Sequence, residues 1–406
     1  MNWTRAQINV VIAAYLGWTL DAFDFFLMVF VLKDIAAEFN TGIPDVALAI
    51  TLTLAARPVG ALIFGKLADK YGRRPTLMLD IALYSILELL SGFSPNLTTL
   101  LVLRTLFGVA LGGEWGVGTA LAMETVPPRA RGLVSGLLQA GYPSGFLLAS
   151  IVFGTLYQHI GWRGMFFVGV IPALLVLYIR MSVPESPAFE TMVKTKRPGL
   201  WATFRQNWTL SLYCIILMTA FNFFSHGSQD LYPTFLREQH HFDPHTVSLI
   251  VIVLNIGAIV GGLFFGSLSE KIGRRRAICI AALIALPVIP LWAFSGGVLA
   301  LALGAFLMQI SVQGAWGVIP VHLNEISPPE IRATFPGFVY QLGNLLASVN
   351  ATVQASYAVK NGNNYALALA VVGGTAAVVI AVLIWFGRER HGVDMTQAAQ
   401  QVATAH

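Results

Sequence analysis

The stretch GALIFGKLADKYGRR, residues 60–74, returns later in the chain as GGLFFGSLSEKIGRR, residues 261–275. A second pair, WGVGTALAMETVPPRAR at 115–131 and WGVIPVHLNEISPPEIR at 316–332, is separated by the same 201 residues. Two independent matches at one spacing, close to half of the 406-residue chain, indicate a duplicated structural unit. We therefore expect two halves that share one fold.

The composition is that of a membrane protein. Hydrophobic residues make up 56% of the chain and charged residues only 11%, whereas a soluble domain carries roughly 25% charged residues. Apolar runs long enough to span a bilayer, about 17 to 25 residues, centre near residues 20, 56, 85, 110, 144, 172, 222, 257, 286, 311, 345 and 375. These runs predict an all-α membrane protein of twelve transmembrane helices in two pseudo-symmetric six-helix bundles. The expected division is an N-terminal bundle at 1–182, a cytoplasmic linker at 183–207, a C-terminal bundle at 208–387 and a cytoplasmic tail at 388–406.

The distribution of positive charge predicts the orientation. If the N-terminus is cytoplasmic, 19 of the 25 Lys and Arg residues fall on the cytoplasmic side, where these residues concentrate in membrane proteins. We therefore expect an integral protein of the cytoplasmic (inner) membrane with both termini cytoplasmic. This topology accounts for the net charge of +5 without a nucleic-acid partner.

Parallel repeats of this kind are typical of secondary transporters, whose substrate lies between the halves near the bilayer midplane. Ionisable residues within a membrane span are costly, and they mark substrate or proton sites by default. The segment NFFSHGSQD, residues 222–230, has several such polar groups. Residues four apart share a helix face, so Asn222, His226, Asp230 and Thr234 should form one stripe that faces a central cavity. The alternative is that His226 and Asp230 pair only to hold this helix against a neighbour.

Arg57 is the best candidate to bind a carboxylate, because a guanidinium offers two parallel N–H donors and stays charged when buried. The alternative is an internal ion pair with Asp21 or Asp24, and the two roles can alternate. Asp21 and Asp24 lie three apart on one helix face and are candidates for a second proton site. They are equally well explained as a pair that stabilises the first helix against the second.

Other intramembrane polar residues complete the predicted site. Neutral hydrogen-bonding groups suited to a hydroxyl or keto oxygen, or equally to bonds between helices, are Gln139, Tyr142, Gln341 and Asn344. Arg104 and Glu114 are ten residues apart, roughly 15 Å of helical rise, so they do not form a short pair. Glu88 is a further acid within an apolar run, and the sequence indicates no partner for it.

Several motifs resemble those of the major facilitator superfamily. GKLADKYGRR at 65–74 resembles the family's loop between helices 2 and 3, and GSLSEKIGRR at 266–275 repeats it. RTLFGVALGGEWGVG at 104–118 and METVPPRARG at 123–132 resemble the motifs in and after helix 4, and VPESP at 183–187 resembles the sugar-porter motif after helix 6. The resemblance covers the chain up to about residue 387, and it implies transport by alternating access. It also makes Arg104 a candidate in proton linkage.

Within that superfamily, the pattern from Asn222 to Thr234 resembles the helix-7 signature of the sialate:proton symporters, especially their lactate and pyruvate permeases. GWTLDAFDFF at 17–26 and ARPVGALIFG at 56–65 are similar to the same family. The chain has no room for the extra central helices of the sialate carriers, which favours monocarboxylates. The resemblance implies proton-coupled symport of lactate or pyruvate, with an aromatic-acid or sialate symporter of the same fold as the alternative.

The chemistry of these residues, together with the resemblance for the gating network, assigns them roles. Substrate contacts are expected from Arg57, Asn222, His226, Gln139, Tyr142, Gln341 and Asn344. Proton coupling is expected from Asp230, His226, Asp21, Asp24 and Glu114. A gating network at the cytoplasmic mouth, expected to consist of weak surface ion pairs, comprises Asp69, Arg73, Arg74, Glu124, Arg131, Glu185, Glu270, Arg274, Glu325 and Arg332.

No catalytic constellation is found, so the sequence predicts that the protein is not an enzyme. The chain has no metal-spaced His cluster, no phosphate-binding loop and no nucleophile elbow. We therefore expect no cofactor and no metal. The expected partners are a small carboxylate, protons and the lipid bilayer, and we expect the protein to act as a monomer.

Overall fold

The computed structural model describes residues 3–186, 189, 200–328, 331–332, 334–362 and 364–393. Within these ranges all regular structure is helical, and the predicted all-α fold is confirmed. The predicted linker 183–207 and tail 388–406 lie partly outside the described residues.

The helices of the first half follow the predicted apolar runs. Their bounds are α1 Arg5–Glu38, α2 Ile43–Tyr71, α3 Arg73–Gly92, α4 Leu97–Leu111, α5 Glu114–Thr125, the short 3-10 helix η1 Pro128–Ala130, α6 Arg131–Val168 and α7 Ala173–Ser182. Those of the second half are α9 Leu200–Gln206, α10 Trp208–Gln229, α11 Tyr232–Glu238, α12 Pro244–Ile272, α13 Arg274–Ala293, α14 Val298–Ile326, α15 Phe335–Ala347, α16 Asn350–Lys360 and α17 Tyr365–Trp385.

Ten helical spans of the described chain are long and apolar enough to cross a membrane. One of them, Pro128–Val176, has 49 residues, about 74 Å of helix, which exceeds twice the roughly 30 Å of a bilayer core. Gly161 interrupts it with a non-helical backbone, at φ 64° and ψ −176°, so the span makes two crossings. The consecutive helices α15 and α16, which are separated by a short break, together make one further crossing. The twelve predicted crossings are therefore present.

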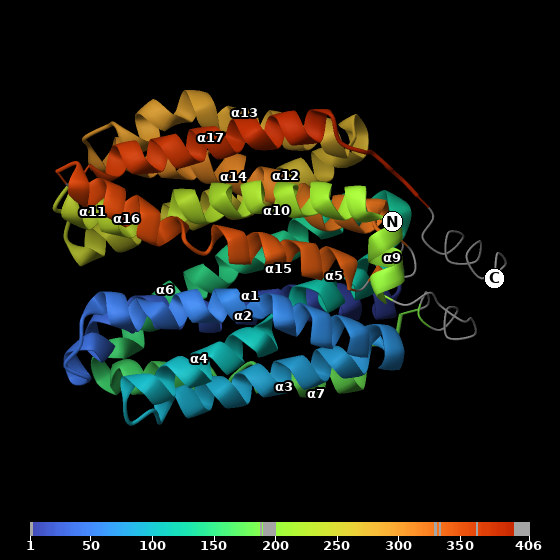
Figure 1. Ribbon diagram of the computed structural model, residues 1–406, viewed down its shortest axis with the longest axis horizontal. Coiled ribbons are helices and arrows are strands. Elements are labelled where there is room, and N and C mark those ends of the chain that lie inside the picture. Colours follow the sequence, from blue (N-terminus) through green and yellow to red (C-terminus); the bar gives the residue numbers. More distant parts are fainter. Residues whose placement is uncertain are drawn as a thin grey trace.

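The helices form two groups, one on either side of a central interface (Figure 1). In the first group α1 packs against α6, and α4 packs against α2 and α3; in the second, α14 packs against α12 and α13, and α10 packs against α15. The groups meet where α6 contacts α12 and α14, and where α2 contacts α15. α1 begins and α17 ends at the same end of the molecule, which we name the termini end (Figure 1); the opposite end is the far end.

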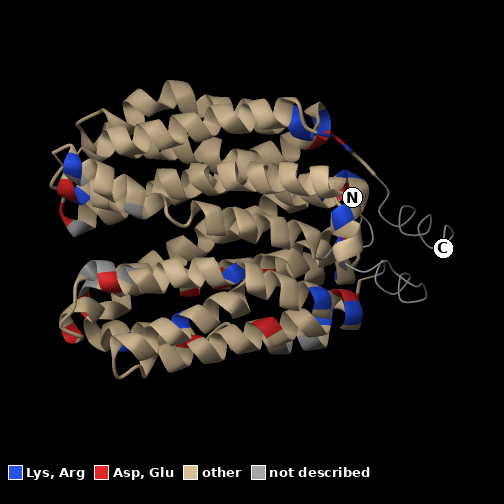
Figure 2. Cartoon of the chain, viewed as in Figure 1, with Lys and Arg blue, Asp and Glu red and all other residues tan. Residues whose placement is uncertain are grey.

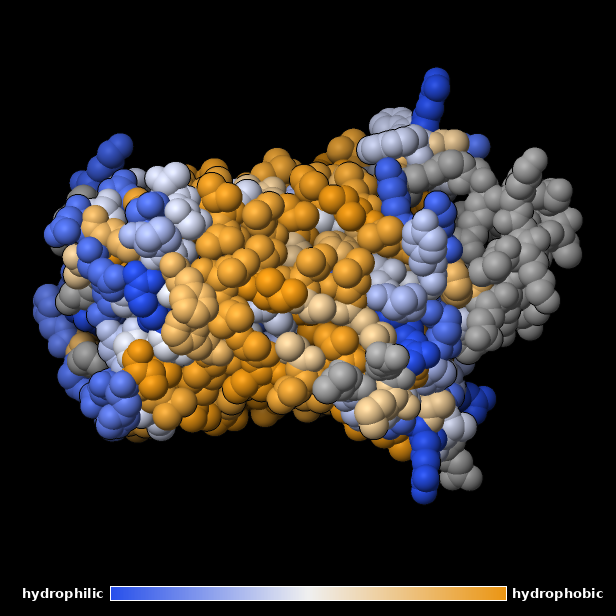
Figure 3. Space-filling model, turned by 90° about the horizontal axis from the view of Figure 1, so that it is seen from below, coloured by the Kyte–Doolittle hydropathy of each residue, from blue (hydrophilic) through white to orange (hydrophobic). Residues whose placement is uncertain are grey.

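The outer surface between the two ends is apolar. The face seen in Figure 3 has a hydrophobic band across its middle, with hydrophilic residues at both ends. Large side chains such as Ile63, Leu106 and Phe264 are exposed there. Charged residues gather at the two ends, and those between the ends lie mainly in the group that contains α1 to α4 (Figure 2). The band has the character of a lipid-facing surface.

Glycines bring the two groups close together near the termini end. On α6, Gly132 and Gly136 face Gly262 and Gly266 of α12, and a Cβ atom on Gly136 would lie 2.4 Å from the carbonyl oxygen of Gly262. Small residues at such positions let helix backbones approach closely within a membrane. The closed contact of α6 with α12 therefore depends on the absence of side chains.

Replacing Gly136 with leucine is expected to separate α6 from α12 at the termini end, because the added side chain overlaps the backbone of Gly262. Overpacking of this kind costs about 1–3 kcal/mol. The distance between spin labels at Arg129→Cys and Lys271→Cys should shift to longer values. Gly154→Leu is the control, since a Cβ atom at that position meets nothing within 4 Å. An unchanged distance in Gly136→Leu would contradict the role of this crossing.

Candidate functional site

An ion pair of α1 and α2 lies at the centre of the candidate site. The Nη2 atom of Arg57 donates to Oδ1 of Asp21 over 3.1 Å, and both side chains are buried. The Nε atom of Arg57 and Oδ2 of Asp21 have no hydrogen-bond partner among the described residues. The guanidinium therefore retains donors for a second anion. The sequence had left open whether Arg57 pairs with Asp21 or Asp24, and the structure pairs it with Asp21.

A helix break positions Glu114 beside this pair. The break between α4 and α5 falls at Gly112, where a Cβ atom would lie 2.0 Å from the carbonyl oxygen of Arg57. Glu114 is the first residue of α5, and its carboxyl group lies against Gly17 of α1 and next to Asp21. The close approach of α2 to the break thus brings Glu114, Asp21 and Arg57 together.

A second buried ion pair joins α3 to α4. Arg104 pairs with Glu88, and its guanidinium lies 3.8 Å from the centre of the Phe107 ring. The sequence indicated no partner for Glu88, because positions along two helices do not tell which faces meet. Asp24 lies between the two pairs, near Glu88, with neither carboxylate oxygen hydrogen-bonded to a described residue. Arg104 is therefore engaged away from Glu114, as its spacing had indicated.

Sequence reasoning missed Asp80 of α3. Its side chain is buried and neither oxygen has a hydrogen-bond partner in the described part of the chain. An acid inside an apolar run was the available signal, and in this run it was recognised only for Glu88. The central buried acids of this group, Asp21, Asp24, Asp80, Glu88 and Glu114, outnumber its two central arginines, Arg57 and Arg104. Such an excess is costly in a membrane, which suits a site that takes up protons.

The second group contributes a chain of polar contacts across α10 and α15. The Nδ1 atom of His226 lies 2.9 Å from Oδ2 of Asp230, and Nε2 lies 3.3 Å from Oδ1 of Asn344. Asn344 in turn donates from Nδ2 to Oε1 of Gln341 over 2.7 Å. Asn222 donates from Nδ2 to the backbone oxygen of Met218. His226 is therefore both the partner of Asp230 and the link to α15.

The predicted stripe is shorter than expected. α10 ends at Gln229, and α11 begins at Tyr232 with Pro233 in its first turn, so Thr234 does not continue the face of Asn222 and His226. Pro233 lacks the N–H that would continue the helix. Asp230 sits at the break, and 26% of its side chain is exposed. Asp230 is therefore the most accessible residue in this series of polar contacts.

Two serines of α10 bond to α14. Gln309 donates from Nε2 to the Ser228 hydroxyl oxygen over 3.3 Å, and Gln313 donates to that of Ser225 over 3.5 Å. Gln229 donates to Ser225 over 3.2 Å, within α10. Ser225 and Ser228 therefore hold this helix against a neighbour. Gln309 and Gln313 were missed, although an amide within an apolar run is the same signal that identified Gln139 and Gln341.

Gln139 and Tyr142 of α6 lie at the interface between the groups. The Trp115 indole donates from Nε1 to Oε1 of Gln139 over 3.5 Å. The ring of Tyr142 stacks on Trp18, with centroids 5.6 Å apart and an interplanar angle of 29°. Both residues are buried, and an aromatic cluster therefore surrounds the neutral part of the candidate site.

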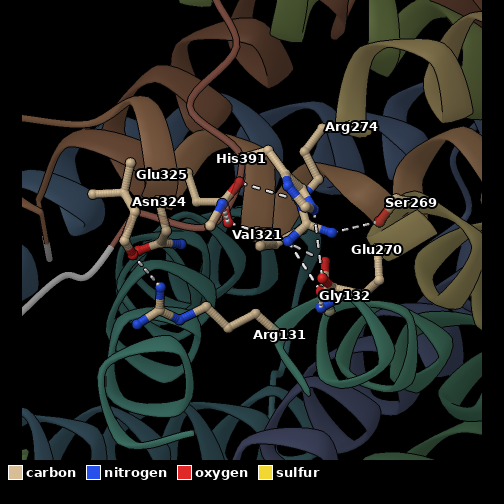
Figure 4. Close-up of polar contacts among 12 residues, drawn as sticks. Arg131, Gly132, Ser269, Glu270, Arg274, Val321, Asn324, Glu325 and His391 are labelled. Carbon is tan, nitrogen blue, oxygen red and sulfur yellow. Dashed lines mark hydrogen bonds and ion pairs between the residues drawn. The ribbon is translucent and has the colours of Figure 1, made fainter. Parts of the chain in front are cut away.

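The charged network at the termini end has the predicted members but is buried. Arg274 pairs with Glu270 at 3.0 Å and Glu325 at 3.1 Å (Figure 4). At matched positions of the other repeat, Arg73 pairs with Asp69 at 3.4 Å and with Glu124 at 3.3 Å. Neither arginine side chain is exposed. The expectation of surface ion pairs was wrong, because each arginine lies among packed helices that carry its acidic partners.

Matched acids of the two repeats reach across the central interface. Glu270 of α12 accepts a hydrogen bond from the backbone N–H of Gly132, at the start of α6 (Figure 4). Asp69 of α2 accepts one from the hydroxyl of Thr334, the residue before α15. The positive end of a helix dipole favours a carboxylate there. Both contacts close the termini end, and both must break if the groups separate there.

An acid after the last helix of each repeat caps the network of the same repeat. Glu185 accepts from the backbone N–H groups of Arg73 and Arg74, and Glu389 accepts from that of Arg274. Beyond Glu389, the carbonyl of Val393 accepts from Arg131 over 2.7 Å. Arg332, the counterpart of Arg131, is buried. The first residues of the tail therefore lie against the network, while residues 394–406 lie outside the described chain.

Comparisons with known proteins agree with this architecture. The family model of the Major Facilitator Superfamily matches residues 14–229 and 231–404. The chain is 29% identical to the "Carboxylic acid transporter protein homolog" of Saccharomyces cerevisiae, covering 97% of this chain and 69% of that protein. It is 30% identical to the "Sialic acid transporter NanX" of Escherichia coli, covering 93% of each. The solved structure of the proton:xylose symporter XylE superposes with a TM-score of 0.80 at 18% identity, over 98% of this chain and 99% of that one. The chain therefore belongs to the Major Facilitator Superfamily, whose members are integral membrane transporters and not enzymes.

Proposed function

We propose that the protein carries short monocarboxylates, lactate or pyruvate, together with protons across the cytoplasmic membrane. The observation that carries the proposal is Arg57, a buried guanidinium with one hydrogen-bonded partner and unfilled N–H donors among the described residues. It lies within the interface region that superfamily transporters use for substrate. A carboxylate accepts two parallel bonds from such a fork.

The polar residues that link α10 to α15 are suited to bind the end of a small acid that lies opposite its carboxylate. Gln341, Asn344 and His226 supply neutral donors and acceptors, and Asp230 supplies an accessible acid. We infer that the carboxylate binds Arg57 and that the hydroxyl or keto oxygen binds these polar residues. Asp230 and Asp21 then carry protons in turn, since Asp21 loses its partner when the substrate takes Arg57.

Symport follows from the energetics of charge movement. A monoanion entering against a negative-inside potential costs about 2.3 kcal/mol per 100 mV. One proton moved with it makes the load neutral and removes this cost. The solved relative XylE is described as a proton:xylose symporter, which supports the same coupling on this fold.

We take the two bundles, 1–182 and 208–387, as the units that rock around the site. The termini end is assigned to the cytoplasm from the distribution of Lys and Arg. Breaking the contacts Glu270–Gly132 and Asp69–Thr334 then opens the cytoplasmic mouth. We propose that a single chain suffices, because the site is built from both bundles of one molecule.

The second candidate is a sialate or aromatic-acid symporter, favoured by the similarity to the sialic acid transporter of Escherichia coli. Uptake of labelled lactate into proteoliposomes under an inward proton gradient separates the two. We expect accumulation that a protonophore abolishes and that pyruvate, but neither benzoate nor sialate, inhibits. Uptake of sialate without uptake of lactate would support the second candidate function in place of the first.

A further inference from the structure

An aromatic cluster lies across the central interface, between the polar site and the cytoplasmic mouth. Tyr340 of α15 contacts Trp18 of α1 with ring centroids 6.4 Å apart, and Trp115 of α5 with centroids 4.8 Å apart. It also contacts Trp316 of α14, at 5.4 Å. All four side chains are buried. Tyr340 is thus the one member of this quartet whose ring touches the three others.

The quartet lies on the cytoplasmic side of the polar groups on every helix that contributes to it. Trp18 precedes Asp21 by three residues on α1, and Tyr340 precedes Asn344 by four on α15, about 4.5 and 6 Å nearer the mouth. α5 and α14 run in the opposite direction. On them Trp115 follows Glu114, and Trp316 follows Gln313 by three residues. The rings therefore form a floor beneath the substrate site.

The floor is closely packed. One turn nearer the mouth, α15 and α5 meet at Gly337 and Gly116, where a Cβ atom on Gly337 would lie 2.9 Å from the Cα atom of Gly116. A cavity beside Trp18 and Trp115 measures about 10 Å³, which is about the least volume that holds one water. It is too small to pass a carboxylate.

We propose that this aromatic floor is the inner gate of the transporter and that Tyr340 is its central residue. Two of the three ring contacts of Tyr340 are with the N-terminal bundle, so they must break when the bundles part at the cytoplasmic end. Its contact with Trp316 stays within the C-terminal bundle. Tyr340 therefore moves with α14 and α15, and its movement opens the substrate site toward the cytoplasm.

Truncation of the ring is expected to favour the inward-open state. An aromatic pair shifts an equilibrium by roughly two- to tenfold, so losing two pairs should raise the inward-open to outward-open ratio by about fourfold to a hundredfold. Tyr340→Phe should leave the ratio unchanged, because the ring makes these contacts. This inference concerns the gate, and it does not depend on which acid is carried.

The test is a distance measurement between spin labels at Arg129→Cys and Lys271→Cys in the full chain, with Cys214→Ala and Cys279→Ala removing the buried native thiols. Tyr340→Ala should populate a longer distance, and Tyr340→Phe should not. Phe221→Ala is the matched control, since Phe221 packs against Trp316 inside one bundle, with centroids 5.3 Å apart.

Trp115→Leu removes the same contact from the other bundle, and it keeps the test valid if Tyr340→Ala does not fold. It should also populate the longer distance. A distance distribution in folded Tyr340→Ala or Trp115→Leu that matches the unsubstituted protein would overturn the proposal. An equal shift in Phe221→Ala would overturn it too, because that result would reflect general loosening of the cluster.

Discussion

Arg57→Ala is expected to reduce carboxylate uptake by at least about a hundredfold. Hydrogen bonds to charged groups contribute about 1.5–3 kcal/mol each, and a carboxylate on Arg57 would make two of them. Uptake of labelled lactate into proteoliposomes measures the loss. Arg57→Lys keeps the charge without the fork, so it should retain only a small part of the activity.

The buried pair with Asp21 gives a second explanation for such a loss, because an unpaired buried acid destabilises the protein by about 3–5 kcal/mol. The double variant Arg57→Ala with Asp21→Asn separates the two. It removes the unpaired charge, so we expect it to fold and remain inactive. Recovery of uptake in this double variant would reduce Arg57 to a structural partner of Asp21.

Asp230→Asn is expected to abolish proton-driven accumulation while substrate exchange continues. Asn preserves the size of the side chain and a hydrogen bond to His226, which lies 2.9 Å from the carboxylate, but it carries no proton. Accumulation under an inward proton gradient should fall at least about tenfold. Counterflow, in which labelled substrate exchanges for unlabelled substrate, should remain within about twofold of the unsubstituted protein.

Asp243→Asn provides the matched control for Asp230. Asp243 caps the start of α12 in the far-end loop, where it accepts from the backbone N–H groups of His245 and Thr246. Asn caps helices about as well as Asp, so this variant should retain both activities. Accumulation by Asp230→Asn equal to that of Asp243→Asn would remove Asp230 from the proton path. His226→Ala should reduce proton-driven accumulation more severely than substrate exchange.

The duplicated stretches predicted the fold, because a repeat of six apolar runs leaves few arrangements in a bilayer. The break at Gly112 was not predicted, because it depends on the close approach of the backbone of α2. A turn near Gly161 was expected, since the runs centred near 144 and 172 were predicted as separate crossings. The sequence therefore located the turns between crossings better than the break within one.

The sequence indicated which residues belong to the candidate site better than it indicated which of them pair with one another. Arg57, His226 and Asp230 stand out as polar residues in apolar runs. The partnership of Glu88 with Arg104 depends on the rotation of two helices, which hydropathy alone does not fix. The burial of Arg274 depends likewise on how α12 and α14, which carry its partners Glu270 and Glu325, pack around it. Tyr340 gave no signal, because an aromatic residue in a membrane helix is ordinary.

The coupling of proton to substrate is tested most directly by the lumen pH of proteoliposomes that contain a trapped fluorescent pH indicator. Lactate added outside should acidify the lumen faster than in protein-free liposomes, which report passive diffusion of the neutral acid. Arg57→Ala should match the protein-free rate. Entry of labelled lactate through the protein without added acidification would contradict the proposed symport.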